Sequence, residues 1–238
     1  MLLLAFETSA KACSCALLRD GLLLAESYQN SGQTHSRTLM KMAEDMLANC
    51  DLTAKDVDAV GVAAGPGSFT GVRIGVSCAK GFAWAGELPC WGVSTLEAMA
   101  RIVLPFEGTV CAVMDARRQQ VYNALFRSDG SVLTRLCQDR AISVEDLAGE
   151  LKNIEGPKIL VGDGAVLCYN SLKDAIAGLR LAPEHLRQQR ASGVALCAYA
   201  LARSDDPGDG AALTPNYLRL SQAERERLER EKRENKGE

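Results

Sequence analysis

The chain has 238 residues, of which 47% are hydrophobic and 24% are charged, and its formal net charge is −3. These values are typical of a globular protein with a full hydrophobic core, in one large domain or two small ones. The negative net charge argues against a broad basic surface for RNA or DNA. Another subunit would therefore have to supply most of the contact with any nucleic acid.

The first residues do not resemble a targeting segment. The stretch MLLLAFETS has no basic lead, and its apolar run before Glu7 is too short for a signal sequence or a membrane span. We therefore expect a cytoplasmic protein that does not associate with membranes. The nine cysteines include no Cys-x-x-Cys pair, which favours small buried thiols in a reducing compartment over disulfides or a zinc site.

The first half of the chain predicts a three-stranded meander followed by alternating helices and strands. The meander strands are expected at Leu2–Phe6, Cys13–Leu18 and Leu22–Ser27, and an Asp-Gly turn joins the last two. Apolar residues at helical spacing predict an amphipathic helix over Thr34–Cys50. The remaining elements expected in this half are strands at Asp58–Ala63 and Pro89–Val93 and helices at Thr70–Ala85 and Ser94–Arg101.

The same order of elements begins again in the second half. A second meander is expected at Thr109–Met114, Val121–Arg127 and Val132–Cys137, again with an Asp-Gly turn. Later elements are helices at Ser143–Leu151, Ala165–Leu172 and Ser192–Ala202, a strand at Lys158–Val161 and an extended segment at Thr214–Leu220. Ser143, with Asp146 three residues later, and Ser192 are expected to cap the helices that they open. The repeat predicts an α/β fold of two related lobes, residues 1–105 and 106–220. A charged tail at 221–238 is expected to be a solvated helix or a frayed end.

The helix predicted at Thr70–Ala85 is apolar on nearly every side, and Gly71, Gly75 and Ala79 form a row of small residues along it. Such a helix must be covered all round. Its own lobe could supply the whole cover, or a partner helix could approach the small residues in a subunit interface. The residues that would form this interface are Leu39, Met42, Met46, Gly71, Val72, Gly75, Ala79 and Phe82.

The turn Gly65-Pro66-Gly67-Ser68 joins a strand to a helix N-terminus, a geometry that can bind an anion through free backbone N–H groups. It lacks the Lys-Ser/Thr pair of a Walker loop. A tight turn with Ser68 or Thr70 as the helix cap is the simpler interpretation. Phosphate binding remains an alternative.

Two acids, Glu7 and Asp115, end the first strands of the two meanders and would face each other across a cleft between the lobes. Paired carboxylates of this kind hold magnesium phosphate. However, no glycine follows either acid, so the backbone cannot approach phosphates closely. A vestigial nucleotide cleft that includes Glu7, Thr8, Ser9 and Asp115 is therefore favoured over a working one. His35 has no second histidine nearby, which favours a capping or surface role over metal binding.

Several motifs together resemble the bacterial TsaB family, also called YeaZ. They are ETS at Glu7–Ser9, AAGPGSFTGVRIG at Ala63–Gly75, Asp-Ala-Arg-Arg from Asp115, Gly162-Asp163-Gly164, and PNYLR at Pro215–Arg219. The resemblance implies two duplicated α/β lobes of the actin, sugar kinase and Hsp70 (ASKHA) type. It implies a role in making threonylcarbamoyladenosine in tRNAs that read codons beginning with adenine. It also implies pairing with the related catalytic subunit TsaD, recruitment of the ATPase TsaE, and contact with tRNA through the complex.

The related subunit binds metal through a His-x-x-x-His motif, and the corresponding positions here are Thr95 and Met99. Neither is a competent ligand in this setting, so we expect no metal site and no cofactor. The expected function is a non-catalytic subunit that binds its catalytic paralogue through a four-helix contact and forms a homodimer when alone. Gly75→Arg would then abolish pairing and leave a folded monomer. An ATP-dependent enzyme and a metallopeptidase are the alternatives.

Overall fold

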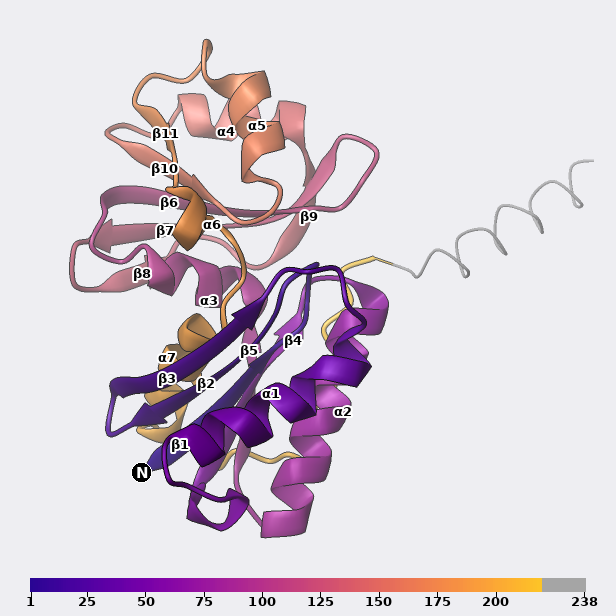
Figure 1. Ribbon diagram of the computed structural model, residues 1–238. Helices are drawn as coiled ribbons and strands as arrows, with labels where there is room; N and C mark the ends of the chain where they lie inside the picture. The colour runs from indigo at the N-terminus through magenta and orange to yellow at the C-terminus, as the bar shows by residue number, and fades with distance from the viewer. Residues whose placement is uncertain (220–238) are drawn as a thin grey trace, which may run out of the picture.

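Two β-sheets, each covered by helices, form two lobes stacked on one another (Figure 1), as seen in the computed structural model, which describes residues 1–219. The first sheet has the order β3-β2-β1-β4-β5. Its strands are β1 (Leu2–Glu7), β2 (Cys13–Arg19), β3 (Leu22–Gln29), β4 (Ala59–Gly65) and β5 (Cys90–Ser94). The charged tail predicted at 221–238 lies outside the described residues.

The second sheet repeats this order as β8-β7-β6-β10-β11, with β9 also paired to β7. Its strands are β6 (Glu107–Asp115), β7 (Gln120–Asp129), β8 (Leu133–Arg135), β9 (Arg140–Ser143), β10 (Lys158–Val161) and β11 (Leu179–Leu181). In the first sheet, β1 pairs antiparallel with β2 and parallel with β4. In the second sheet, β6 pairs in the same way with β7 and β10. The prediction of two duplicated α/β lobes is thereby confirmed.

The helices are α1 (His35–Asn49), η1 (Ala54–Asp56), α2 (Phe69–Gly86), α3 (Thr95–Ile102), α4 (Val144–Lys152), α5 (Ala165–Leu172), α6 (Glu184–Arg187) and α7 (Ala191–Ala202). Two predicted caps are confirmed, because Ser68 Oγ accepts from Gly71 N and Ser143 Oγ accepts from Asp146 N. The predicted capping serine of the last helix instead lies inside the first turn of α7. The short β9, β11, η1 and α6 were not predicted, because three or four residues carry no periodic signal.

Helix α7 packs on the first sheet although it comes from the end of the chain. Leu3 and Ala5 of β1 face α7, whereas Leu2 and Phe6 face the layer of α1 and α2. Successive residues of a strand point to opposite faces, so both faces of this sheet are covered. The range 106–220 predicted for the second lobe therefore includes a helix that completes the first.

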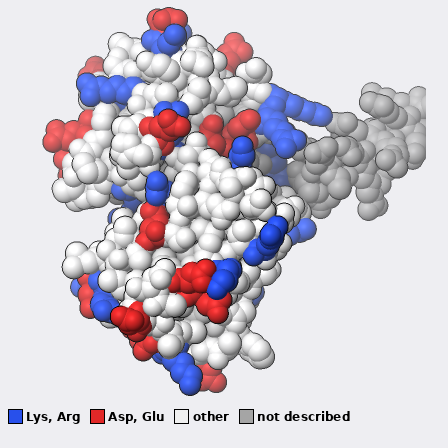
Figure 2. Space-filling model, viewed as in Figure 1, with Lys and Arg blue, Asp and Glu red and all other residues white. Residues whose placement is uncertain are grey.

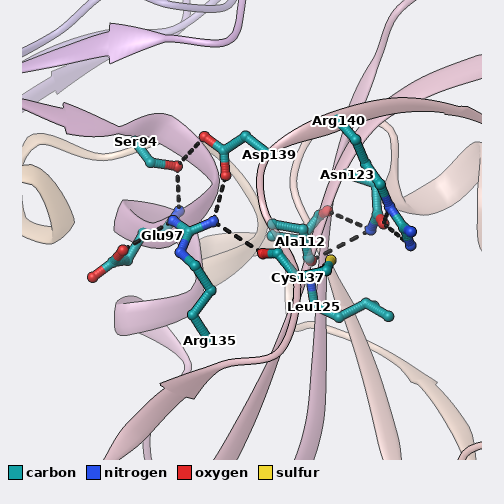
Figure 3. Close-up of polar contacts among 10 residues, drawn as sticks. Ser94, Glu97, Ala112, Asn123, Leu125, Arg135, Cys137, Asp139 and Arg140 are labelled. Carbon is teal, nitrogen blue, oxygen red and sulfur yellow. Dashed lines mark hydrogen bonds and ion pairs between the residues drawn. The ribbon is translucent and has the colours of Figure 1, made fainter.

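Helix α3 joins the lobes, and a polar cluster beside it links the two sheets (Figure 3). Ser94 Oγ, at the end of β5, donates to Asp139 Oδ2 at 2.6 Å. The Arg135 guanidinium donates both to Asp139 Oδ1 at 2.6 Å and to Glu97 Oε2 at 2.9 Å. Arg135 lies on β8 and Asp139 in the loop between β8 and β9, so these bonds connect the second lobe to the end of β5 and to α3.

No helix within residues 1–219 is long and apolar enough to cross a membrane. All nine cysteines have free thiols, and six of them are buried, as expected for small core residues: Cys13, Cys15, Cys90, Cys111, Cys168 and Cys197. Cys50, Cys78 and Cys137 are half-buried.

Candidate functional site

The inner face of α2 lies directly on the loop between β1 and β2. A Cβ atom at Gly71 would overlap the carbonyl oxygen of Thr8, and one at Gly75 would overlap the Thr8 hydroxyl. That hydroxyl donates to Gly71 O at 2.8 Å. The close contact expected of these glycines is therefore made with the chain's own β1–β2 loop.

Most of the other predicted interface residues also lie in the core of the first lobe. The side chains of Leu39, Val72 and Ala79 are at most 1% exposed, and Met46 is 5% exposed. Met42 and Phe82 are half-buried at the edge of this core. Of these side chains, Met42 and Phe82 are the ones that reach the surface of the lobe.

The outer face of α2 is exposed and almost free of charge. At helical spacing it presents Thr70, Arg73, Ser77, Gly81 and Trp84, and Trp84 is 85% exposed. A Cβ atom at Gly81 would meet nothing within 4 Å. Glycine in a helix interior costs about 1 kcal/mol relative to alanine. Packing within the chain gives no reason for Gly81, in contrast to Gly71 and Gly75.

Residues 211–219 form a strap that runs along α2. The Lys80 ammonium donates to the carbonyls of Ala211 and Leu213 at 3.0 and 2.9 Å. Tyr217 stacks on Phe69 with ring centroids 4.2 Å apart, and its hydroxyl accepts from Arg73 Nε at 2.7 Å. The strap then reaches the second lobe, where Arg219 donates to the carbonyl of Ala116.

A cavity of about 600 Å³ lies between the lobes. Its walls are the β1–β2 loop, the turn before α2, the β6–β7 hairpin and the strap. The residues that line it are Ser9, Ala10, Lys11, Pro66, Gly67, Ser68, Phe69, Thr70, Met114, Asp115, Ala116, Arg117, Tyr122, Asp163, Asn216, Tyr217, Leu218 and Arg219. Sequence reasoning missed Lys11, Arg117 and Arg219 as a group, because only the tertiary fold brings their segments together.

The two predicted cleft acids each turn back on their own hairpin. Glu7 is 1% exposed and accepts from Ser9 N at 2.6 Å. Burial raises the pKa of Glu7 to about 7, with hydrogen bonding from Ser9 opposing this shift. Asp115 is exposed and accepts from Arg117 N at 2.7 Å. Each carboxylate thus accepts a hydrogen bond within its own hairpin, and the vestigial character of the cleft stays a prediction.

Asp163, from the Gly-Asp-Gly turn after β10, is a third acid at the cavity. It accepts from Gln189 Nε2 at 2.8 Å, and burial raises its pKa. Within residues 1–219, no group of three or more His, Cys, Asp or Glu side chains is placed to hold a metal ion. The positions compared with the metal-binding histidines, Thr95 and Met99, are buried on α3.

His35 lies in the first turn of α1, where the sequence predicts a capping or surface residue. Its Nε2 is 2.8 Å from the carbonyl oxygen of Ala10. Because a carbonyl only accepts, Nε2 carries the proton. The histidine thus ties α1 to the β1–β2 loop beside the cavity.

Two stacked lobes with the same strand order and a cavity between them define an ASKHA-type protein. A fold of this kind is shared with component A of the (R)-2-hydroxyglutaryl-CoA dehydratase of Acidaminococcus fermentans, at a TM-score of 0.52 and 14% identity over 86% of this chain and 100% of that one. The YeaZ structure from Pseudomonas aeruginosa matches at a TM-score of 0.74 and 25% identity, over 91% of this chain and 99% of that one.

Sequence comparisons identify the family. A family model described as TsaD, tRNA N6-adenosine threonylcarbamoyltransferase, matches residues 25–225. The tRNA threonylcarbamoyladenosine biosynthesis protein TsaB of Bacillus subtilis (strain 168) is 33% identical over 98% of this chain and 100% of its own length. TsaB of Escherichia coli (strain K12) is 35% identical over 69% of this chain and 72% of its own length. The chain belongs to the TsaB family of tRNA threonylcarbamoyladenosine biosynthesis proteins.

Proposed function

We propose that this chain is a non-catalytic subunit that binds a TsaD-like catalytic paralogue and supports threonylcarbamoyl transfer to adenosine in tRNA. The pair recruits a TsaE-like ATPase, and the chain forms a two-fold homodimer when the paralogue is absent. The reaction takes place in the cytoplasm, and this subunit contributes no cofactor. The proposal follows from the family and from the surface of α1 and α2.

The outer face of α2 is the observation that carries the proposal. Trp84 is 85% exposed, and Gly81 has open space beside it. Exposed tryptophan in an otherwise uncharged stripe is typical of binding hot spots, and a glycine allows a partner backbone to come close. These two residues take the place of Gly71 and Gly75 in the proposed contact.

Helix α1 lies beside α2 on the same face of the first sheet (Figure 1) and extends this surface. Met40 on α1 is 41% exposed, and the half-buried Met42 and Phe82 add to the apolar area. Two neighbouring helices from each subunit give the four-helix arrangement expected from the sequence.

The absence of catalysis by this subunit is supported by the geometry of the acids and of α3. Glu7 and Asp115 hydrogen-bond within their own hairpins. Thr95 and Met99 pack in the core instead of facing the cavity, and Met99 Sδ would lie 3.0 Å from a Cβ atom at Gly162. Side chains in these positions cannot hold a metal ion that activates water or polarises a substrate.

The test compares two arginine substitutions of helical glycines. Gly81→Arg is expected to abolish pairing with the paralogue, because a long charged side chain would stand in the middle of the contact. Gly149→Arg on α4 is the matched control, since Gly149 also lies inside a helix with nothing within 4 Å of its Cβ position. Both variants should fold. Pairing is measured by size-exclusion chromatography and calorimetry, and an unchanged complex with Gly81→Arg would overturn the proposal.

The enzyme alternatives are tested with the same protein. Calorimetry with ATP and magnesium should give no binding that depends on Asp115. Tight binding that Asp115→Ala abolishes would favour an ATP-dependent enzyme instead. Metal found by elemental analysis, together with peptidase activity lost on chelation, would favour a metallopeptidase.

A further inference from the structure

Basic side chains from three separate segments line the cavity between the lobes. Lys11 comes from the β1–β2 loop, Arg117 from the β6–β7 hairpin and Arg219 from the strap. None of the three forms an ion pair within residues 1–219. Figure 2 shows Lys and Arg side chains gathered beside the point where the described chain ends. The cavity mouth is therefore locally basic on a chain whose net charge is −3.

The two acids that also line the cavity offset this charge only in part. Asp115 already accepts a hydrogen bond from Arg117 N in its own hairpin. Asp163 is largely buried, and burial raises its pKa, which disfavours its charged form. A negatively charged ligand at the mouth would thus meet more exposed positive than negative charge.

The β6–β7 hairpin holds its arginines in an unusual backbone conformation. Arg117, Arg118 and Gln119 have φ angles of 64°, 56° and 59°. Residues with side chains cost about 1 kcal/mol or more each in this left-handed region. Such conformations cluster at ligand-binding sites. In this hairpin, one of the residues with a left-handed backbone is Arg117, which lines the cavity.

The N-terminus of α2 lies on the opposite wall of the cavity, where Ser68 N donates to Ser9 O at 2.6 Å. The turn at Gly67 and Ser68 lines the cavity, and a helix N-terminus favours an anion. Ser9 lies against Gly67, where a Cβ atom would overlap it. Ser9 is fully buried, lines the cavity, and its hydroxyl has no completed hydrogen bond. This hydroxyl also lies beside Glu7, where it opposes the rise that burial causes in the pKa of that carboxyl.

Aromatic rings complete the mouth. The stacked pair of Phe69 and Tyr217 lies at its edge, and Tyr217 is 40% exposed. Proteins recognise single-stranded RNA by combining cations for phosphates with aromatic side chains for unstacked bases. A cavity of about 600 Å³ also lies within the range of sites that enclose one small ligand, such as a single nucleotide.

We propose that the mouth of this cavity binds tRNA directly, with Lys11 and Arg117 on backbone phosphates and Tyr217 against an unpaired base. This inference rests on the proposed function, because it assigns the tRNA substrate of the complex a contact on this subunit. RNA fits better than a free magnesium nucleotide, because the cations come from three separate segments around the cavity. In addition, no group of three or more His, Cys, Asp or Glu side chains within residues 1–219 is placed to hold a metal ion.

The test measures tRNA affinity of the pair formed with the paralogue at several salt concentrations. The test variant combines Lys11→Gln with Arg117→Asn, since asparagine tolerates the left-handed backbone. The slope of log affinity against log salt is negative, and each lost phosphate contact reduces its magnitude by about 1, so the magnitude should fall by about 2. Affinity at low salt should fall roughly tenfold or more. The matched control, Lys152→Gln with Lys173→Gln, removes two exposed lysines from the helical layer of the second lobe and should change neither quantity.

The outcomes separate this inference from the proposed function. If the pair forms normally and the test variant keeps the wild-type affinity and slope, the RNA contact is overturned and the proposed function stands. If no pair forms, the proposed function fails, and the same salt titration on the chain alone decides the RNA contact. A titration with ADP gives a third outcome. ADP binding that is lost with Arg117→Asn, with unchanged tRNA affinity, would assign the cavity to a free nucleotide and overturn the inference.

Discussion

The two faces of α2 use glycine for different reasons. On the inner face, Gly71 and Gly75 leave room for the backbone and side chain of Thr8. On the outer face, Gly81 has nothing near it, and Trp84 beside it is exposed. The same residue type in one helix thus marks intramolecular packing on one side and an unoccupied surface on the other. A row of glycines alone does not tell which side faces a partner.

The largest expected contrast is between Gly75→Arg and Gly81→Arg. Gly75→Arg would force a long charged side chain into the core, so it should destabilise the chain by more than about 4 kcal/mol and prevent folding. This replaces the expectation that Gly75→Arg leaves a folded monomer. Gly81→Arg should fold and, like other good helix formers at this open position, gain up to about 1 kcal/mol from helix propensity. Urea unfolding followed by circular dichroism measures both, and a stable Gly75→Arg protein would remove the distinction between the faces.

The β1–β2 loop, which packs against the inner face of α2, directly follows the buried Glu7. The variant Glu7→Gln tests the burial of this carboxyl. The pKa of Glu7 is about 7 when folded, against 4.5 as the reference value. The folded state therefore binds the Glu7 proton more tightly than the unfolded state does. As a result, the free energy of unfolding of the wild type falls as pH rises from 4.5 to about 7, and this carboxyl causes no further change above that pH. Relative to Glu7→Gln, the loss should be on the order of 3 kcal/mol. Urea unfolding at pH 4.5, 6 and 8 tests it, and parallel stability curves for the two proteins would contradict the burial of this carboxyl.

Alanine substitutions give a gentler test of the two faces. Gly71→Ala places a Cβ atom on the Thr8 carbonyl oxygen, which belongs to the backbone and cannot rotate away. We expect a loss of about 2 kcal/mol in the free energy of unfolding. Gly81→Ala meets open space and should gain about 1 kcal/mol from helix propensity. Chemical denaturation measures both, and changes of the same sign would show that the faces are not different.

The smallest expected effect concerns the strap beside the outer face. Tyr217→Phe removes the hydrogen bond from Arg73 and keeps the stacking on Phe69. Stability should fall by only about 0.5–1 kcal/mol, because the bond is partly exposed. Tyr217→Ala, which also removes the ring, should cost more. Equal effects of the two substitutions in thermal unfolding would mean that the stacked ring does not hold the strap.

Local sequence patterns predicted much of the fold. The apolar runs of β1 and β2, the Asp-Gly turns and the second meander after residue 106 predicted the duplicated lobes, and both sheets have the same strand order. Caps at Ser68 and Ser143 were predicted because capping is decided within one turn of helix. The candidate site was harder to predict from the sequence, since Ser9, Arg117 and Arg219 are far apart in the chain.

The sequence by itself determined the α/β class, the repeat, the turn before α2 and a helix that had to be covered on nearly all sides. These are properties of neighbouring residues and of their periodicity. Only the tertiary structure decided that Thr8 covers Gly71 and Gly75, that α7 returns to the first sheet, and that Glu7 and Asp115 turn back on their own hairpins. Those outcomes depend on contacts between residues distant in sequence, which spacing along the chain does not encode.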